Sequence, residues 1–220
     1  MKKIISVAFI LFFLISCYLG QQVPIEFRKG LRGYTGEKTT ISSLININGY
    51  YETKINSVQF KSVGFSKPLE RIDTFYYSYS VFFEDGIFLN NFSLQSINEP
   101  HTSGFYKYSC WGRYTITDDT IKTKYASIYP PFNGPPFARE KWYIVIDRNT
   151  VKWILTKPIR DVSYEEMAYY LKNSATEEVH PSIFVSCDTL PNPDYCWLKK
   201  EKWFWSKEED WKVFMDNFGK

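Results

Sequence analysis

The 220-residue sequence has only two histidines, His101 and His180. A Ser–His or Cys–His dyad would need one of them as its general base. Neither accompanies a nucleophile motif or a His-x-x-x-His spacing, and the chain has no glycine-rich phosphate loop. We therefore predict a protein that is not an enzyme, with no catalytic residue, no metal site and no cofactor.

The sequence also lacks an excess of charge of one sign, since 27 Lys and Arg residues stand against 24 Asp and Glu. Lys2 and Lys3 lie in the leader described below, so a mature chain would carry 25 − 24 = +1. Domains that bind nucleic acid normally present a clustered basic face. We expect no nucleic-acid partner.

A long membrane-spanning run is missing as well. Residues 4–15 are uncharged and apolar, but a bilayer-spanning helix needs roughly 20 such residues. The basic start, the apolar middle and the small residue Ser16 are typical of a secretory signal. Such a leader has three possible outcomes: plain secretion, an uncleaved signal anchor, or cleavage with attachment of lipid.

The stretch Leu14-Ile15-Ser16-Cys17 resembles the bacterial lipobox. This resemblance implies cleavage before Cys17, a diacylglycerol on its thiol and an acylated amine. Two or more acyl chains anchor a protein durably in a membrane. The residues directly after Cys17, Tyr18-Leu19-Gly20, contain no aspartate, which by resemblance to enteric lipoproteins favours the outer membrane of the cell envelope and leaves the leaflet open.

Three consecutive parts are predicted. Residues 1–16 form the lipoprotein signal peptide, and residues 17–43 form the lipidated cysteine and a flexible tether, since they show glycines but no hydrophobic period. Residues 44–220 form one domain, a lipocalin-like β-barrel with a C-terminal helix.

Aromatic residues are abundant, with 17 Tyr, 18 Phe and 7 Trp, and they suit half-buried β-strands. Residues 73–84 have the period of a strand: one face carries Phe75, Tyr77, Tyr79, Val81 and Phe83, and the other carries Thr74, Tyr76, Ser78, Ser80 and Phe82. Turns at Asp85-Gly86, Asp118-Asp119 and Asp147-Arg148-Asn149 separate strand-like segments and predict hairpins. The strand-like segments are residues 46–54, 73–84, 87–94, 106–117, 120–129, 142–146 and 151–155, with a proline-rich loop at residues 130–138.

The end of the chain is less regular. Residues 163–172 begin with a capping box, Ser163 with Glu166, and predict a helix. Residues 182–186 and 200–205 are expected to be closing strands. A second capping box, Ser206 with Glu209, begins a predicted amphipathic helix. The prediction is an all-β antiparallel up-and-down meander that closes as a barrel, with a short C-terminal helix.

The stretches "NINGYYE", "VFFEDGIF", "YSCWGRYTITDDTIKTKY" and "WYIVIDRNTVKWI" resemble lipocalin-like lipoproteins of the Bacteroidetes type. The resemblance covers about residues 44–155. It rests on a G-x-aromatic first strand and a W-G-x-Y-x-I strand. In lipocalins that carry ligands the first strand has G-x-W, whereas Tyr51 stands in the Trp position here.

Two kinds of side chain are candidates for a role beyond packing. Three cysteines other than Cys17 could pair in three ways: Cys110, Cys187 and Cys196. The favoured disulfide joins Cys187 and Cys196, which flank Pro191-Asn192-Pro193. Aromatic residues on predicted strands would line an apolar cavity if the barrel has room: Tyr77, Tyr79, Phe83, Trp111 and Trp142. Otherwise the barrel is filled by its own side chains.

The resulting prediction is a non-catalytic binding module, anchored to the envelope membrane by its lipid, for a small hydrophobic ligand. The alternative is a structural subunit that binds another envelope protein and has no ligand pocket.

Overall fold

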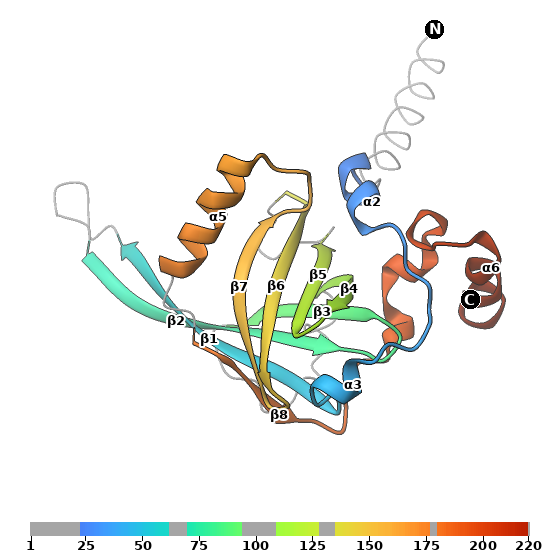
Figure 1. Ribbon diagram of the computed structural model, residues 1–220, viewed down its shortest axis with the longest axis horizontal. Helices are drawn as coiled ribbons and strands as arrows, with labels where there is room; N and C mark the ends of the chain where they lie inside the picture. The colour runs from blue at the N-terminus through green and yellow to red at the C-terminus, as the bar shows by residue number, and fades with distance from the viewer. Residues whose placement is uncertain (1–22, 62–69, 94–108, 128–134, 177–179, 220) are drawn as a thin grey trace, which may run out of the picture.

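The computed structural model describes residues 23–61, 70–93, 109–127, 135–176 and 180–219. Eight antiparallel strands, each hydrogen-bonded to the next in chain order, close into a barrel (Figure 1). The predicted up-and-down barrel with a C-terminal helix is confirmed. The strands are β1 (Gly49–Lys61), β2 (Glu70–Phe82), β3 (Ile87–Ser93), β4 (Cys110–Thr117), β5 (Thr120–Ser127), β6 (Phe137–Asp147), β7 (Thr150–Pro158) and β8 (Ser182–Ser186).

The three predicted hairpin turns are confirmed. Gly86, between β2 and β3, has φ 86°, and Asp118, between β4 and β5, has φ 53°, the left-handed region that such tight turns require. Between β6 and β7, the Asn149 N–H donates to Asp147 Oδ1 at 2.7 Å. Strand β6 begins earlier than predicted, because Phe137 and Ala138 pair with β5 instead of ending a loop.

Two glycines in the motifs quoted above allow close backbone contact. A Cβ at Gly49 would overlap the carbonyl oxygen of Val185 on β8, and one at Gly112 would overlap that of Lys124 on β5. A side chain at either position would push neighbouring strands apart.

Alternate strand residues form two hydrophobic clusters. The lumen cluster brings together residues from strands that are not neighbours: the Phe82 ring of β2 lies 5.7 Å from the Tyr143 ring of β6. Because only the inside of a barrel joins such strands, this cluster fills the lumen. Its buried members are Ile41, Ile45, Tyr51, Phe82, Phe88, Cys110, Tyr114, Ile121, Tyr125, Tyr143 and Val151.

The outer cluster lies on the opposite face of β2, β3 and β4, where the two ends of the chain cover the barrel wall. From the wall it takes Tyr79, Val81, Phe83, Leu89 and Trp111, and from the chain ends Leu31, Tyr34, Leu198, Phe204, Trp205 and Phe214. Figure 1 shows α2 (Ile25–Leu31) and the C-terminal helices on this side, and α5 (Tyr164–Thr176) on the other.

The predicted tether at residues 17–43 is wrong for the part that the structure describes. Residues 25–31 form α2, and a short helix α3 (Ile41–Leu44) closes one end of the lumen. Leu31 and Ile41 are fully buried. The segment has too few apolar residues to show a period in the sequence, but those it has pack against the barrel.

The closing strand predicted at residues 200–205 is also wrong. The chain instead forms short 3₁₀ helices, η2 (Pro193–Tyr195), η3 (Trp197–Lys200) and η4 (Lys202–Phe204), followed by α6 (Glu208–Phe218). Their apolar side chains pack on an outer wall that has no free strand edge here, so no ladder forms. Lys207 precedes α6 without a side-chain cap, so the capping box expected at Ser206 and Glu209 is absent.

The capping box of α5 is confirmed. Ser163 N–H donates to Glu166 Oε2 at 3.1 Å, and Glu166 N–H donates to Ser163 Oγ at 3.2 Å. Arg160 adds an ion pair to Glu166 at 2.6 Å. The helix is thereby fixed at its start, and it packs against β7.

A buried ionic cluster holds the two chain ends to the β2–β3 hairpin. Lys199 Nζ lies 2.8 Å from Asp85 Oδ2 and 2.9 Å from Asp194 Oδ1, and the Tyr34 hydroxyl donates to the same Asp85 oxygen at 2.8 Å. The Lys199 side chain is only 4% exposed. We call Tyr34, Asp85, Asp194 and Lys199 the terminal clamp.

Candidate functional site

The aromatic residues predicted to line a ligand cavity lie outside the lumen. Tyr79, Phe83 and Trp111 are buried in the outer cluster, where Phe83 stacks on Trp111 with ring centroids 6.1 Å apart. Tyr77 is half-buried against the same cluster. Trp142 also lies on the outer face, with Lys122 Nζ 4.4 Å above its ring. Tyr79, Phe83 and Trp111 pack against the terminal segments in the outer cluster.

The lumen residues came from the other strand face, the one that looked less apolar in the sequence. The lumen also holds polar side chains that are hydrogen-bonded to each other. Ser80 Oγ is 2.8 Å from the Tyr143 hydroxyl, and Asn90 Nδ2 donates to Ser78 Oγ at 3.0 Å. Lys141 is buried here, with its ammonium 4.1 Å from the centre of the Trp153 ring. Among the described residues, the lumen is therefore filled by rings at one end and lined by polar groups farther along.

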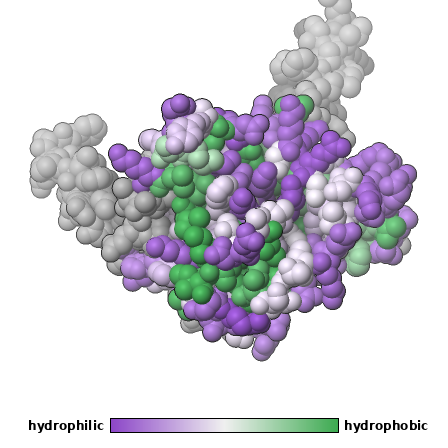
Figure 2. Space-filling model, viewed as in Figure 1, coloured by the Kyte–Doolittle hydropathy of each residue, from purple (hydrophilic) through white to green (hydrophobic). Residues whose placement is uncertain are grey.

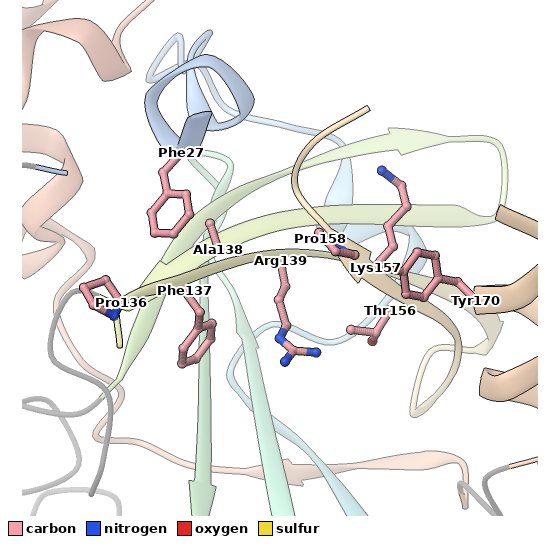
Figure 3. A pocket seen from close by; sticks show the side chains of 9 residues that line it. All are labelled: Phe27, Pro136, Phe137, Ala138, Arg139, Thr156, Lys157, Pro158 and Tyr170. Carbon is pink, nitrogen blue, oxygen red and sulfur yellow. The ribbon is translucent and has the colours of Figure 1, made fainter. Parts of the chain in front are cut away.

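A pocket of about 470 Å³ lies where β6 begins and β7 ends, and we call it the strand-end pocket. Figure 3 shows Phe27 reaching it from α2 and Tyr170 from α5, on two sides of the strand ends. Its size is within the range of pockets that bind small molecules. It is lined by Phe27, Pro136, Phe137, Ala138, Arg139, Thr156, Lys157, Pro158 and Tyr170.

The two cations of this pocket differ in how their charge is balanced. Lys157 Nζ lies 3.0 Å from Glu140 Oε2, and both side chains are buried. Because the two charges are opposite, this pair is neutral overall. Arg139 is exposed and forms no ion pair with any carboxylate in the described part of the chain. Its guanidinium lies 5.7 Å from the centre of the Phe137 ring. The pocket thus combines an apolar wall with one uncompensated positive charge.

Such a lining can bind a small molecule that has an apolar body and an anionic end. The apolar side chains would bury the body, and Arg139 can donate two parallel hydrogen bonds to a carboxylate or phosphate. Sequence reasoning missed this site because its residues fall in four separate segments. Phe27 was assigned to the tether and Phe137 to a loop, and no local pattern links either one to Tyr170.

The described cysteines are free thiols, so the predicted disulfide between Cys187 and Cys196 is absent from the structure. Cys196 lies at the start of η3 with its N–H bound to Pro193, and the Cys187 N–H is bound to Asn48 at the end of β8. Burial raises the pKa of the Cys110 and Cys196 thiols to about 12, which keeps both protonated and unreactive. Cys17, the predicted lipidation site, lies outside the described residues.

The described part of the chain contains no group of three or more His, Cys, Asp or Glu side chains that could hold a metal ion. None of its helices combines the length and the apolar character needed to cross a bilayer. Comparison of the sequence with protein-family models, with curated proteins and with solved structures gives no match in any of the three.

Proposed function

We propose that the protein is a lipid-anchored binding module of the bacterial cell envelope, with Cys17 as its anchor and the strand-end pocket as its ligand site. The ligand is a small amphipathic anion, such as a fatty acid. The sequence Leu14-Ile15-Ser16-Cys17 after a basic and apolar leader supports the anchor. The observation that carries the ligand class is Arg139, which has no ion pair among the described residues, in a pocket whose other cation, Lys157, is paired with Glu140.

Rigidity of the surrounding elements also supports this site. Arg139 and Phe137 are on β6, which pairs with β5 on one side and β7 on the other. Tyr170 is on α5, whose start is fixed by its capping box and by Arg160. A pocket on such elements needs little reorganisation when a ligand binds, which favours affinity.

The test uses the full-length protein, purified in a non-denaturing detergent, and a fatty acid carrying a dansyl fluorophore. We expect saturable binding that a methyl ester of the same probe does not reproduce, because the ester lacks the anionic end. Arg139→Gln should weaken binding of the acid by about ten- to one-hundred-fold, as expected for loss of a charge-assisted hydrogen bond worth about 1.5–3 kcal/mol.

Lys152→Gln is the matched control, since Lys152 is exposed on β7 and does not line the pocket. Equal affinity of the acid for the wild type and Arg139→Gln, or equal affinity of the acid and its ester, would rule out this ligand class. The intact mass of the same preparation reports the anchor: we expect the leader to be absent and acyl groups to be present on Cys17.

The second candidate is the protein-binding subunit, and one observation favours it. Figure 2 shows a hydrophobic band along β7 next to α5. Ile146 and Ile183 lie on strands that both pair with β7. Thr150 of β7 pairs with Ile183 on one side and with Asp147, the residue after Ile146, on the other. Ile146 is 54% exposed and Ile183 is 51% exposed. Chemical crosslinking in intact envelopes tests this reading: a partner crosslinked at residue 183, and lost in Ile183→Lys, would support it.

A further inference from the structure

A second cavity, of about 540 Å³, lies between α2 and η4 on the outer side of the barrel. We call it the basic groove. Its lining includes four cations, one carboxylate and a tryptophan: Arg28, Lys29, Arg32, Lys202, Glu208 and Trp203. We propose that the basic groove docks onto the anionic headgroups of the bilayer in which Cys17 is anchored, and this inference rests on the anchor proposed above.

The walls of the groove are fixed to each other by backbone hydrogen bonds. The N–H groups of Gly33 and Tyr34 both donate to the carbonyl oxygen of Phe204, each at 3.0 Å, and the Ser206 N–H donates to the Tyr34 carbonyl at 2.7 Å. The Tyr34 ring stacks on Phe204 with centroids 5.0 Å apart. The cations of α2 and η4 are therefore presented together on one rigid surface.

Most of the positive charge in the groove is not neutralised by the protein. Lys202 pairs with Glu208 at 2.7 Å. No salt bridge within the described ranges involves Arg28, Lys29 or Arg32, and the last two are exposed. Arg28 Nε donates to the Val23 carbonyl at 2.9 Å, so Lys29 and Arg32 are the side chains that we expect to meet phosphate groups.

The charge of the groove contrasts with that of the remaining molecule. Its four cations and one carboxylate give +3, whereas a mature chain beginning at Cys17 carries +1, so the remainder carries +1 − (+3) = −2. An anionic surface would attract the groove and repel the rest. This asymmetry favours one orientation of the protein on a charged bilayer.

The position of the groove in the chain brings it to the membrane. Cys17 lies eight residues before Ile25, the first residue of α2. Eight residues span at most about 28 Å when fully extended, so an acylated Cys17 keeps α2 close to the bilayer. Trp203 is half-buried, and its indole N–H donates to Glu201 at 2.7 Å. Tryptophan is enriched at the membrane interface, where one part of the ring is apolar and the other polar.

The experiment places the full-length acylated protein in vesicles of phosphatidylcholine, with or without phosphatidylglycerol, in which the lipid is brominated. Bromine quenches tryptophan fluorescence on contact, and the difference between the wild type and Trp203→Phe isolates the signal of Trp203. We expect strong quenching only when phosphatidylglycerol is present, and less quenching as salt rises.

The double variant Lys29→Gln with Arg32→Gln should lower the ratio of docked to undocked protein by about 25-fold, at about five-fold for each cation removed near an anionic surface. The control variant carries Lys152→Gln with Lys172→Gln, two exposed lysines on β7 and α5, and should behave as the wild type. Unchanged quenching in Lys29→Gln with Arg32→Gln would overturn the proposal. Equal quenching in vesicles with and without phosphatidylglycerol would also overturn it, as would tighter binding to an acidic polypeptide than to the anionic vesicles. Failure of the anchor is seen separately, as a missing acyl mass at Cys17.

Discussion

The terminal clamp gives a sharp prediction about stability. Asp85→Asn keeps the shape of the side chain but removes the charge that faces Lys199 and the Tyr34 hydroxyl. Removing one partner of a buried ion pair costs about 3–5 kcal/mol, because the other charge stays buried. Lys199 keeps Asp194 at 2.9 Å, and the Asp85 side chain is 23% exposed. We therefore expect a smaller loss, about 2–3 kcal/mol of unfolding free energy.

The difference in exposure within the clamp predicts an order of effects. Lys199→Met leaves carboxylates that are 23% and 27% exposed and can be hydrated, so it should cost less than Asp85→Asn. Asp85→Asn combined with Asp194→Asn leaves Lys199 buried without a carboxylate. This double variant should be the least stable of the three, by more than the sum of its single changes.

Urea unfolding of the full-length protein, followed by tryptophan fluorescence, measures these differences, provided that the denaturant slope stays constant. Asp188→Asn is the matched control, because Asp188 is exposed on the surface. The reasoning is refuted if Asp85→Asn lies within about 0.5 kcal/mol of the wild type, which is the usual effect of a surface substitution. It is also refuted if Lys199→Met is the most damaging change.

Three further predictions concern the lumen, the thiols and α5. Phe82→Ala should lower the free energy of unfolding by about 3–5 kcal/mol in the same urea assay, since the ring is buried among four others. A decrease below about 1 kcal/mol, roughly that of a surface change, would contradict the packing. Iodoacetamide should modify Cys187 well before the fully buried Cys196 in unreduced native protein, as peptide mass spectrometry would show, whereas a disulfide-linked peptide of the two would contradict the free thiols. The Arg160 guanidinium and the Ser163 N–H lower the pKa of Glu166 to about 2, so its support of α5 is complete above the usual carboxyl pKa of 4.5 and is lost as pH falls towards 2. NMR titration of that carboxyl should show a higher pKa in Arg160→Gln, and an unchanged value would contradict the ion pair.

The hairpins were predictable because their signals are local. An Asp-Gly turn and an alternating strand act over a few residues, so β2, β3 and the turn between them could be recognised without knowledge of the rest. The same holds for α5, whose capping box joins residues three apart. Strand ends were less predictable, since Phe137 and Ala138 became strand only by pairing with β5.

The strand faces could not be assigned from sequence. Alternation shows that Tyr79 and Phe82 lie on opposite faces of β2, but both faces are buried in this protein. The more apolar face was expected to line the lumen, whereas it faces outward beneath the chain ends. That outcome depends on α2 and η4, whose apolar residues are too few to form a recognisable period.

The all-β class and the order of the hairpins follow from the sequence, whereas the leader and the lipobox at Cys17 stay predictions. Those features depend on residue type and on spacings of a few residues. The tertiary structure alone decided which aromatic residues fill the lumen, that residues 23–44 are folded, and where uncompensated cations gather. Arg139 and Phe27 line one pocket, and Arg32 and Lys202 line one groove, only because the fold brings together segments that are far apart in the chain.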